Sequence, residues 1–384
     1  MPQNEDSRTP IVLVFLVNGT AASPMGVRAQ EFARRLSGDF QVHVAYRSAR
    51  KVRSIWTLLC YLRRIRPSVC YVLDMGYSGV LAAGLYRAIS RCKIVVDTGD
   101  AIFALARSLG RGPVGLALTK ALEFIALRIS HRLVVRSHFH QEWLAQRGFT
   151  ADVIPDGVDT EQFRPMDVSD LRRKYGVEGF KTIGVLGSVT WNKCSQSCYG
   201  WDLVEVIRLL RDQPVKGMIV GDGSGIDYLK ARCADYGILD RVIFLGFVPY
   251  DKLPPILNLM DVCLSTQTND LVGHVRTTGK LPLYLACGCF VLATDVGEAA
   301  RVLPRAMRCS CEGVSGEHYP SKLAQRVRSL IEGPSSIHGS EAQVLLAKEH
   351  FEYCRLSEML RHTLLACLRS SLVKESTLSE RPSI

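Results

Sequence analysis

The sequence predicts an α/β protein of two Rossmann-like, doubly wound domains that face a cleft. An apolar run at 11–17 has the length of a parallel strand buried on both faces, and a loop of small residues joins it to a helical pattern at 27–36. The same order of strand, loop and helix starts again at 182–210. Because this unit opens a doubly wound domain, its recurrence predicts two separate sheets, with a ligand at the carboxyl ends of their strands.

Strands and helices are expected to alternate in both halves. In the first half, hydrophobic periodicity predicts strands at 41–45, 70–73, 94–97, 132–135 and 151–154, and helices at 55–65, 79–90 and 116–127. The second half predicts strands at 182–186, 217–220, 242–245, 262–265 and 290–293, and helices at 201–210, 226–236, 253–259, 280–286, 322–332, 341–350 and 356–367. Loops are expected at 187–200, 269–279 and 294–298, and disorder at 1–9 and 370–384.

Composition is that of a globular protein with an uneven charge. The 384 residues are 47% hydrophobic and 22% charged, and they are enough for two domains with their own cores. The net charge is +11, and residues 1–160 hold 21 basic and 12 acidic residues, so +9 of the excess lies there. A basic face suits nucleic acid, an anionic membrane or a phosphorylated substrate. No nucleic-acid-binding motif is recognisable, so a nucleic-acid partner is not expected.

Cysteine usage and apolar stretches predict the compartment. Thirteen scattered cysteines with no C-x-x-C pair exclude a zinc ribbon and disfavour a disulfide framework, which indicates buried thiols in a reducing cytoplasm. The run at 11–17 is too short to span a membrane, and the one at 114–127 is interrupted by Lys120 and Glu123. We therefore expect a cytoplasmic protein without a spanning helix.

The stretch 269–301 carries the first candidate site. A polar loop leads through Gly279 and Lys280 into a short apolar helix, followed by a buried strand and a second loop. Thr277, Thr278 and Gly279 are expected to present backbone N–H groups and hydroxyls at the start of that helix, where the partial positive charge favours a phosphate. Lys280 adds a full positive charge. A plain helix cap is the alternative interpretation of the Thr-Gly pair.

Two segments carry a family resemblance. The sequence KLPLYLACGCFVLATDVGEAA at 280–300 resembles the nucleotide-sugar region of GT-B glycosyltransferases, specifically the retaining family 4 type. PDGVDTEQFRP at 155–165 matches the P-N-G-V-D-x-x-x-F-x-P hinge of that family at six of seven defined positions, with Asp156 in the Asn place. An ordinary turn is the weaker alternative there. Resemblance over about 11–368 implies an acceptor-side domain at 1–160, a nucleotide-sugar domain at 161–350, and a crossing helix with a disordered tail at 351–384.

One family feature is missing from this chain. Relatives usually carry two glutamates eight positions apart, the first near the sugar and the second near the ribose. Here these positions are Val275 and Leu283, so both carboxylates are absent.

The resemblance also assigns donor-binding residues, each with a structural alternative. VLGSVTWNK at 185–193 resembles the pyrophosphate motif G-R-x-x-x-x-K, where Gly187 and Lys193 match and Ser188 replaces the arginine. Lys193 is expected to contact the phosphate; the alternative interpretation is an exposed lysine without a ligand. Gly221 and Asp222 correspond to a segment that ends a strand beside the donor site in the family. The alternative interpretation is a tight turn without a ligand. In GFVP at 246–249, Phe247 and Val248 correspond to a segment that contacts the nucleotide base in the family. The alternative interpretation is a loop that only changes the direction of the chain.

Acceptor-side candidates follow from the first half. Gly26 lies where relatives carry a glycine pair, and Arg136 ends a strand at the same rim. Asp100 is the candidate catalytic carboxylate, which orients a sugar hydroxyl or acts as a base, although an Asp after a strand is often a helix cap. No serine lies in a nucleophile elbow. No Asp-x-Asp cluster follows a strand, so neither a metal nor a cofactor besides the donor is expected.

The basic segment 47–66 has two interpretations. Its helix combines basic residues with Trp56, Leu58, Leu59, Tyr61 and Leu62. Such a segment docks on the anionic inner face of a membrane, or it is a core-packed helix with a solvated basic side.

The function that the resemblance implies is retaining transfer of a sugar. The donor would be a nucleotide diphosphate-sugar and the acceptor a glycan or lipid-linked molecule, as in polysaccharide biosynthesis. The alternatives are a catalytically degenerate relative that binds glycan or membrane as a scaffold, and a sugar-nucleotide epimerase of the same fold.

Overall fold

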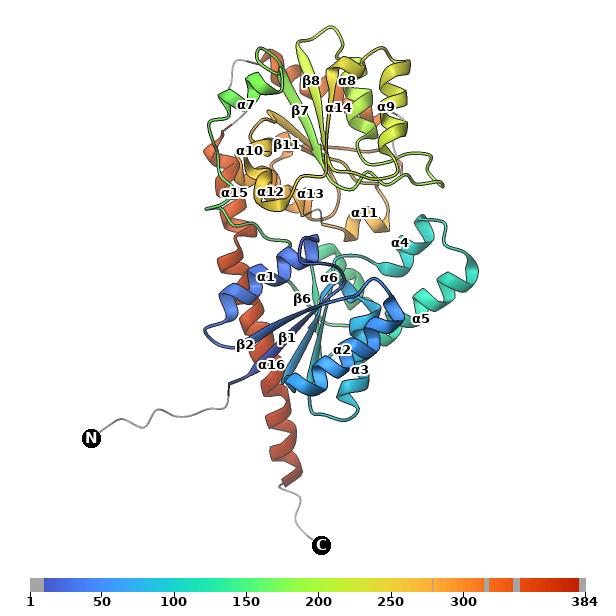
Figure 1. The fold of residues 1–384 in the computed structure, drawn as a ribbon, viewed down its shortest axis with the longest axis vertical. Helices are drawn as coiled ribbons and strands as arrows, with labels where there is room; N and C mark the ends of the chain where they lie inside the picture. Colours follow the sequence, from blue (N-terminus) through green and yellow to red (C-terminus); the bar gives the residue numbers. More distant parts are fainter. Residues whose placement is uncertain (1–9, 278, 314–317, 334–338, 380–384) are drawn as a thin grey trace, which may run out of the picture.

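The protein is built of two six-stranded parallel sheets, one in each half of the chain (Figure 1). The computed structural model describes residues 10–277, 279–313, 318–333 and 339–379, the side chains of 370–379 excepted. The strand orders are β2-β1-β3-β4-β5-β6 and β12-β11-β10-β7-β8-β9. The predicted fold class, two Rossmann-like α/β domains, is confirmed.

The first domain alternates strands and helices from β1 onward. Its strands are β1 (Val12–Val17), β2 (Gln41–Tyr46), β3 (Val69–Val72), β4 (Lys93–Thr98), β5 (Arg132–Val135) and β6 (Ala151–Val153). Its helices are α1 (Pro24–Leu36), α2 (Lys51–Ile65), α3 (Tyr77–Arg87), α4 (Ile102–Ser108), α5 (Pro113–Ile129) and α6 (His138–Ala145), with a 3-10 turn at Leu73–Met75. Strand β1, which lies between β2 and β3, is apolar throughout because helices cover both faces of the sheet.

The second domain repeats this layering. Its strands are β7 (Lys181–Leu186), β8 (Val215–Val220), β9 (Val242–Gly246), β10 (Val262–Ser265), β11 (Phe290–Thr294) and β12 (Arg308–Cys309). Its helices are α7 (Ser169–Lys174), α8 (Trp201–Leu209), α9 (Ile226–Asp235), α10 (Leu253–Leu257), α11 (Leu271–Val275), α12 (Lys280–Ala286), α13 (Gly297–Val302), α14 (Tyr319–Glu332) and α15 (Glu341–Phe351). Three 3-10 turns lie at Leu239–Arg241, Tyr250–Lys252 and Arg305–Met307.

The C-terminal helix α16 (Tyr353–Ser379) crosses back to the first domain, as the sequence predicts (Figure 1). At the crossing, the backbone N–H of Val158 donates to Phe351 at 2.8 Å, and that of Tyr353 donates to Val158 at 3.1 Å. Leu356, Leu360, Leu364 and Cys367 then join the apolar cluster beneath α1 and the first sheet. The segment 155–165 is therefore tied directly to the start of the returning helix.

Two expectations about irregular segments are wrong. Disorder was expected over 370–384, but α16 continues to Ser379 because nothing before Pro382 breaks a helix; residues 1–9 and 380–384 lie outside the described part. The expected loops 269–279 and 294–298 contain α11 and the start of α13. The first is capped by Asp270, whose carboxylate accepts from the N–H of Gly273. Helices this short show no periodicity that a sequence pattern can reveal.

Most of the cysteines are buried, as the sequence analysis expects. All thirteen lie among the described residues, none is in a disulfide, and ten are buried. Within the described ranges, no helix has the length and apolar character needed to cross a bilayer.

Candidate functional site

Three glycines bring the carboxyl ends of β7, β8 and β9 together. The N–H of Gly187 donates to Val220 at 2.9 Å, and the N–H of Gly221 donates to Gly246 at 2.8 Å. Gly221 has φ +137°, and a Cβ there would lie 1.9 Å from the carbonyl oxygen of Gly187. Only glycine permits this approach, so the predicted residues Gly187 and Gly221 hold two strand-end loops against each other.

Lys280 lies beside this glycine junction. Its Nζ is 3.4 Å from the ring centroid of Tyr199, and a Cβ on Gly187 would lie 3.1 Å from it. Burial, with a smaller contribution from Arg276, lowers the pKa of Lys280 to about 7. Among the ion pairs of the described residues, none includes Lys280. A lysine held in this way, without a carboxylate partner, is suited to an incoming anion.

The other predicted donor residues lie around this junction with different degrees of exposure. Lys193 is exposed in the 187–200 loop. The hydroxyl of Ser188 is 2.8 Å from that of Thr190, and Asp222 accepts from the N–H of Gly223, which is a local turn contact. Phe247 is exposed, whereas Val248 packs partly against the second-domain core.

The loop before α12 lies close to the 155–165 segment. The hydroxyl of Thr277 is buried without a hydrogen-bond partner. Gly279 is exposed, and a Cβ there would lie 3.5 Å from a carboxylate oxygen of Asp156 in the 155–165 segment. Thr278 lies outside the described residues.

The two positions that lack glutamates are part of the packed interior. Val275 is fully buried, and Leu283 is 5% exposed within an apolar cluster that also contains Cys287 and Ala347. The carbonyl of Val275 accepts from the hydroxyl of Ser137 at 2.8 Å. A carboxylate at position 283 would need hydrogen-bond partners that this apolar cluster does not supply.

Polar contacts join the two domains at the cleft. Arg276 binds Asp100 through two hydrogen bonds of 2.7 and 3.1 Å. Glu298 accepts from the backbone N–H of His138 at 3.0 Å and lies 3.0 Å from the Nδ1 of the same ring. Asp100, the candidate catalytic residue, is therefore at the cleft with its carboxylate held by the opposite domain. Arg276 and Glu298 are not among the predicted site residues, because no local sequence pattern distinguishes them from surface charges.

A buried ionic network lies under the acceptor side of the cleft. Arg28 is 1% exposed and donates to Asp97 at 2.9 Å, to the carbonyl of Pro155 at 2.6 Å and to that of Ile154 at 2.8 Å. Burial alone would raise the pKa of Asp97, but the guanidinium groups of Arg28 and Arg136 hold it below its usual value. Arg28 was missed, although its spacing from Phe32 and Leu36 places it on the buried stripe of α1.

The predicted acceptor-side residues have structural contacts. Arg136 is buried, with its Nε 3.4 Å from Asp97 and 3.6 Å from Asp156. At Gly26, a Cβ would lie 2.2 Å from the carbonyl oxygen of Thr20, so a glycine lets the 20–23 turn pack on the start of α1. Neither residue presents a free polar group to the cleft in this arrangement.

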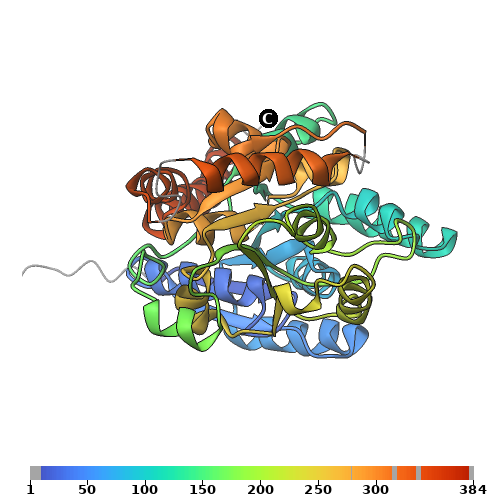
Figure 2. The ribbon, with the colours of Figure 1, turned by 90° about the horizontal axis from the view of Figure 1, so that it is seen from above.

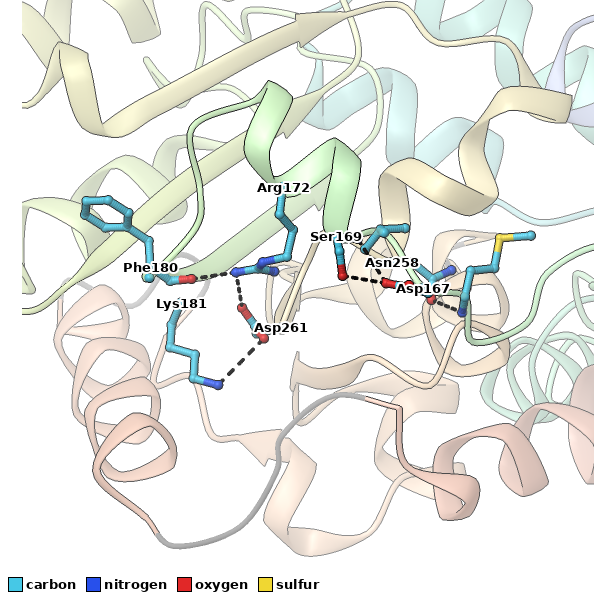
Figure 3. A pocket seen from close by; sticks show the side chains of 10 residues that line it. Asp167, Ser169, Arg172, Phe180, Lys181, Asn258 and Asp261 are labelled. Carbon is cyan, nitrogen blue, oxygen red and sulfur yellow. Dashed lines mark hydrogen bonds and ion pairs between the residues drawn. The ribbon is translucent and has the colours of Figure 1, made fainter.

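A separate hollow lies at the opposite edge of the second sheet (Figure 3). It measures about 480 Å³ and lies between α7 and the amino ends of β7 and β10. Its polar groups bind one another: Arg172 donates to the carbonyl of Phe180, and Asp261 lies 3.7 Å from Arg172 and 3.8 Å from Lys181. Because ligands of parallel sheets bind at the carboxyl ends of the strands, we place the donor site at Gly187 and Lys280 instead.

Residues 181–333 match the family of glycosyl transferases group 1. This match lies within the second domain. The resemblance to GT-B glycosyltransferases is thus confirmed, and the matched segment contains both Gly187 and Lys280.

Relatives and solved structures agree with this assignment. The chain is 31% identical over 193 residues to a 2-deoxystreptamine glucosyltransferase of Streptomyces kanamyceticus, covering 48% of this chain and 46% of that one. It is 23% identical over 235 residues to the GPI3 subunit of the Saccharomyces cerevisiae phosphatidylinositol N-acetylglucosaminyltransferase, covering 59% and 50%. The chain thus spans about half the length of these relatives.

The fold resemblance extends over almost the whole chain. The Anabaena protein HepE, solved with UDP-glucose, superposes with a TM-score of 0.71 at 17% identity, over 93% of this chain and 100% of that one. Sucrose-phosphate synthase of Thermosynechococcus elongatus gives a TM-score of 0.73 at 12% identity, over 93% and 99%. At these identities the likeness establishes the GT-B fold of both domains together.

Proposed function

We propose that this protein transfers a hexosyl group, with retention, from a nucleotide diphosphate-sugar to a glycan or lipid-linked acceptor. The observation that carries the proposal is Lys280, which no described carboxylate pairs with, beside the close contact of Gly187 and Gly221. Relatives support the two substrate classes: HepE was solved with UDP-glucose, and the yeast relative is named for phosphatidylinositol.

The proposed chemistry follows from charge. As the glycosidic bond breaks, the diphosphate leaving group gains negative charge, so a cation fixed beside it stabilises the transition state more than the ground state. Lys280 provides that cation, and we assign Lys193 to the outer side of the same diphosphate. Asp100 would then orient an acceptor hydroxyl from the first domain, held in place by Arg276.

Ligand binding and turnover test the proposal directly. A ligand that binds only the folded state must raise the melting temperature. We expect UDP, GDP or another nucleoside diphosphate, and its sugar derivative, to do so while the free sugar does not. Release of the diphosphate from the stabilising donor, followed by NMR, would then establish turnover and the anomeric outcome. No stabilisation by any nucleoside diphosphate would contradict the proposal.

A catalytically degenerate binding protein is the second candidate. It is favoured by Val275 and Leu283, which are buried where relatives carry glutamates. It predicts a nucleotide-induced rise in melting temperature without release of the diphosphate from any donor. Turnover of a stabilising donor would exclude it.

We predict that the activity needs no metal ion. In this proposal Lys280 and Lys193 provide the positive charge that a divalent cation supplies in other transferases. EDTA treatment followed by dialysis should therefore leave turnover within about twofold of the untreated value, since the charge-stabilising groups remain. Full loss with EDTA and recovery with Mg²⁺ or Mn²⁺ would show the opposite.

We predict that Asp100→Asn lowers turnover by about tenfold at unchanged nucleotide affinity, because it weakens orientation of the acceptor and not binding of the donor. Arg276→Gln serves as the matched variant, since it removes the other half of the same pair. Steady-state kinetics and calorimetry would separate the two effects. Unchanged turnover in Asp100→Asn would remove Asp100 from the site.

We also propose a cytoplasmic location with peripheral contact to the inner membrane face. Cysteines outside disulfides suit a reducing compartment. A lipid-linked acceptor would place the reaction at the membrane surface.

A further inference from the structure

One outer face of the first domain is formed by α2, α3 and α5, on the side of the sheet away from α1 and α16 (Figure 1). The three helices lie side by side. The hydroxyl of Ser78 in α3 donates to the carbonyl of Lys51 in α2 at 2.9 Å. Arg87 in α3 donates to the carbonyl of Ile129 in α5 at 2.8 Å. We call this surface the α2–α3–α5 face.

The α2–α3–α5 face and the adjoining loop expose much of the uncovered apolar surface. Fifteen large hydrophobic residues are exposed among the described residues, and nine of them lie between residues 52 and 125. They are Val52, Trp56, Leu85, Ile89, Leu109, Val114, Leu118, Phe124 and Ile125.

Helix α5 carries the most continuous part of this surface. Val114 is 83% exposed, Leu118 is 60% exposed, and Ile125 completes the row. Their spacing of four and seven residues places them on one side of the helix. A solvent-facing row of this kind is unusual on a covered Rossmann-like helix and indicates an interaction surface.

All exposed charged side chains between residues 47 and 130 are basic. Residues 47–130 contain four acidic residues, and none of them is exposed. Asp74, Asp97 and Asp100 lie at the buried network and the cleft, and Glu123 accepts from the N–H of Phe103. The exposed cations are Arg50, Lys51, Arg53, Arg63, Arg64, Arg66, Arg87, Arg91, Arg107, Arg111, Lys120 and Arg128.

We propose that the α2–α3–α5 face docks on an anionic lipid bilayer. The apolar row of α5 enters the boundary between headgroups and acyl chains, and the surrounding cations bind the headgroups. A second copy of the chain is a poorer occupant, because a symmetric contact would bring like charges together. Nucleic acid would account for the cations but not for the aliphatic row.

The proposed membrane contact extends beyond the basic segment 47–66, for which the sequence offers membrane docking as one interpretation. Within α2, the side chains of Leu58, Leu59 and Leu62 are buried against the sheet, so the core-packed interpretation is right for them. Trp56 and the cations remain outside, but they form only one edge of the α2–α3–α5 face. The aliphatic surface that a bilayer requires comes mainly from α5.

The face is next to the cleft. At Gly110, in the loop between α4 and α5, a Cβ would lie 2.5 Å from the sulfur of Cys194. Cys194 follows Lys193 in the 187–200 loop. Figure 2 shows α5 (teal) at the right-hand edge of the molecule. Docking would therefore bring the cleft to the bilayer surface. A lipid-linked acceptor could then enter the cleft directly from the bilayer; this last step rests on the proposed function.

Vesicle cosedimentation of the full chain tests the proposal. Wild-type protein should bind vesicles of phosphatidylcholine with phosphatidylglycerol and not vesicles of phosphatidylcholine alone, with binding lost at about 0.5 M salt. Val114→Gln/Leu118→Gln/Ile125→Gln should weaken binding by at least about tenfold, because the apolar contact is removed. Arg107→Gln/Lys120→Gln should weaken it as well. All five positions are exposed, so the fold should survive, and thermal unfolding verifies this.

Matched controls lie in the second domain. Leu239→Gln/Leu345→Gln removes two equally exposed leucines, and Lys230→Gln/Arg305→Gln removes two exposed cations. Both should bind as wild type. Unchanged vesicle binding of the α5 variant would overturn the proposal, as would equal binding to neutral vesicles. A dimer that the α5 variant abolishes, or oligonucleotide binding without vesicle binding, would do the same. The vesicles contain neither donor nor acceptor, so these outcomes leave the proposed sugar transfer untouched.

Discussion

Lys280→Ala is expected to weaken nucleoside diphosphate binding by about 2 kcal/mol, roughly 30-fold, which is the scale of a charge-assisted hydrogen bond. The reason is its position: the ammonium lies against Gly187 and the ring of Tyr199, and no carboxylate of the described residues is paired with it. Calorimetry with UDP and GDP measures the effect. Unchanged affinity in this variant and in Lys193→Ala would reject the placement of the donor site.

The pH dependence gives this prediction a sharper form. Burial, and then Arg276, lower the pKa of Lys280 to about 7, so the free protein loses the charge as pH rises through neutrality. A bound diphosphate favours the charged form. Affinity should therefore fall between about pH 6 and pH 9 in the wild type, and the fall should be much smaller in Lys280→Ala.

Other lysines provide graded controls. Lys193 is exposed, so Lys193→Ala should cost about 1.5 kcal/mol, the lower end of the range for a charged contact. Lys181 lies at the amino edge of the second sheet, where it is 3.8 Å from Asp261. Lys181→Ala should leave nucleotide affinity unchanged. An equal loss in all three variants would indicate a general charge effect in place of a site.

Arg28→Ala is expected to lower the free energy of unfolding by about 3–5 kcal/mol, the usual cost of removing one partner of a buried ion pair. Asp97 is fully buried and, among the described residues, would keep Arg136 and the hydroxyl of Tyr71 as partners. The carbonyls of Ile154 and Pro155 would also lose their donor, which loosens the start of the 155–165 segment. Urea unfolding followed by circular dichroism measures the loss.

Two further variants test whether the loss of stability comes from the buried Arg28–Asp97 pair or from removing any positive charge of this helix. Arg34 lies on the same helix but is 61% exposed, so Arg34→Ala should cost no more than about 1 kcal/mol. Arg28→Met/Asp97→Asn removes both charges and should regain part of the stability lost in Arg28→Ala. If Arg28→Ala costs less than Arg34→Ala, the network does not stabilise the first domain.

The network also sets the response to acid. The folded protein holds the pKa of Asp97 below its usual value, so its contribution to stability is complete above the unfolded value, near pH 4, and is lost as pH falls through the folded pKa. In Arg28→Ala the carboxylate loses its nearest cation. Its pKa should rise, and the stability difference from the wild type should shrink at acidic pH.

Much of the fold could be predicted because it depends on local patterns. The apolar runs at β5 and β10 begin and end where the sequence predicts, and α12 covers the expected 280–286. Strands buried on both faces and helices ended by glycine show their character within a few residues. The two-domain arrangement follows from the recurrence of one such unit.

The site and the docking face depend on distant residues that only the tertiary structure brings together. Arg28 and Asp97 are 69 positions apart, and Asp100 and Arg276 are 176 apart. The close contact of Lys280 with Gly187 depends on how two loops meet at the ends of neighbouring strands. Nor does the pattern of α5 reveal that its apolar side faces solvent. Periodicity shows which residues share a face of a helix, whereas the packing of the other elements decides which face is covered.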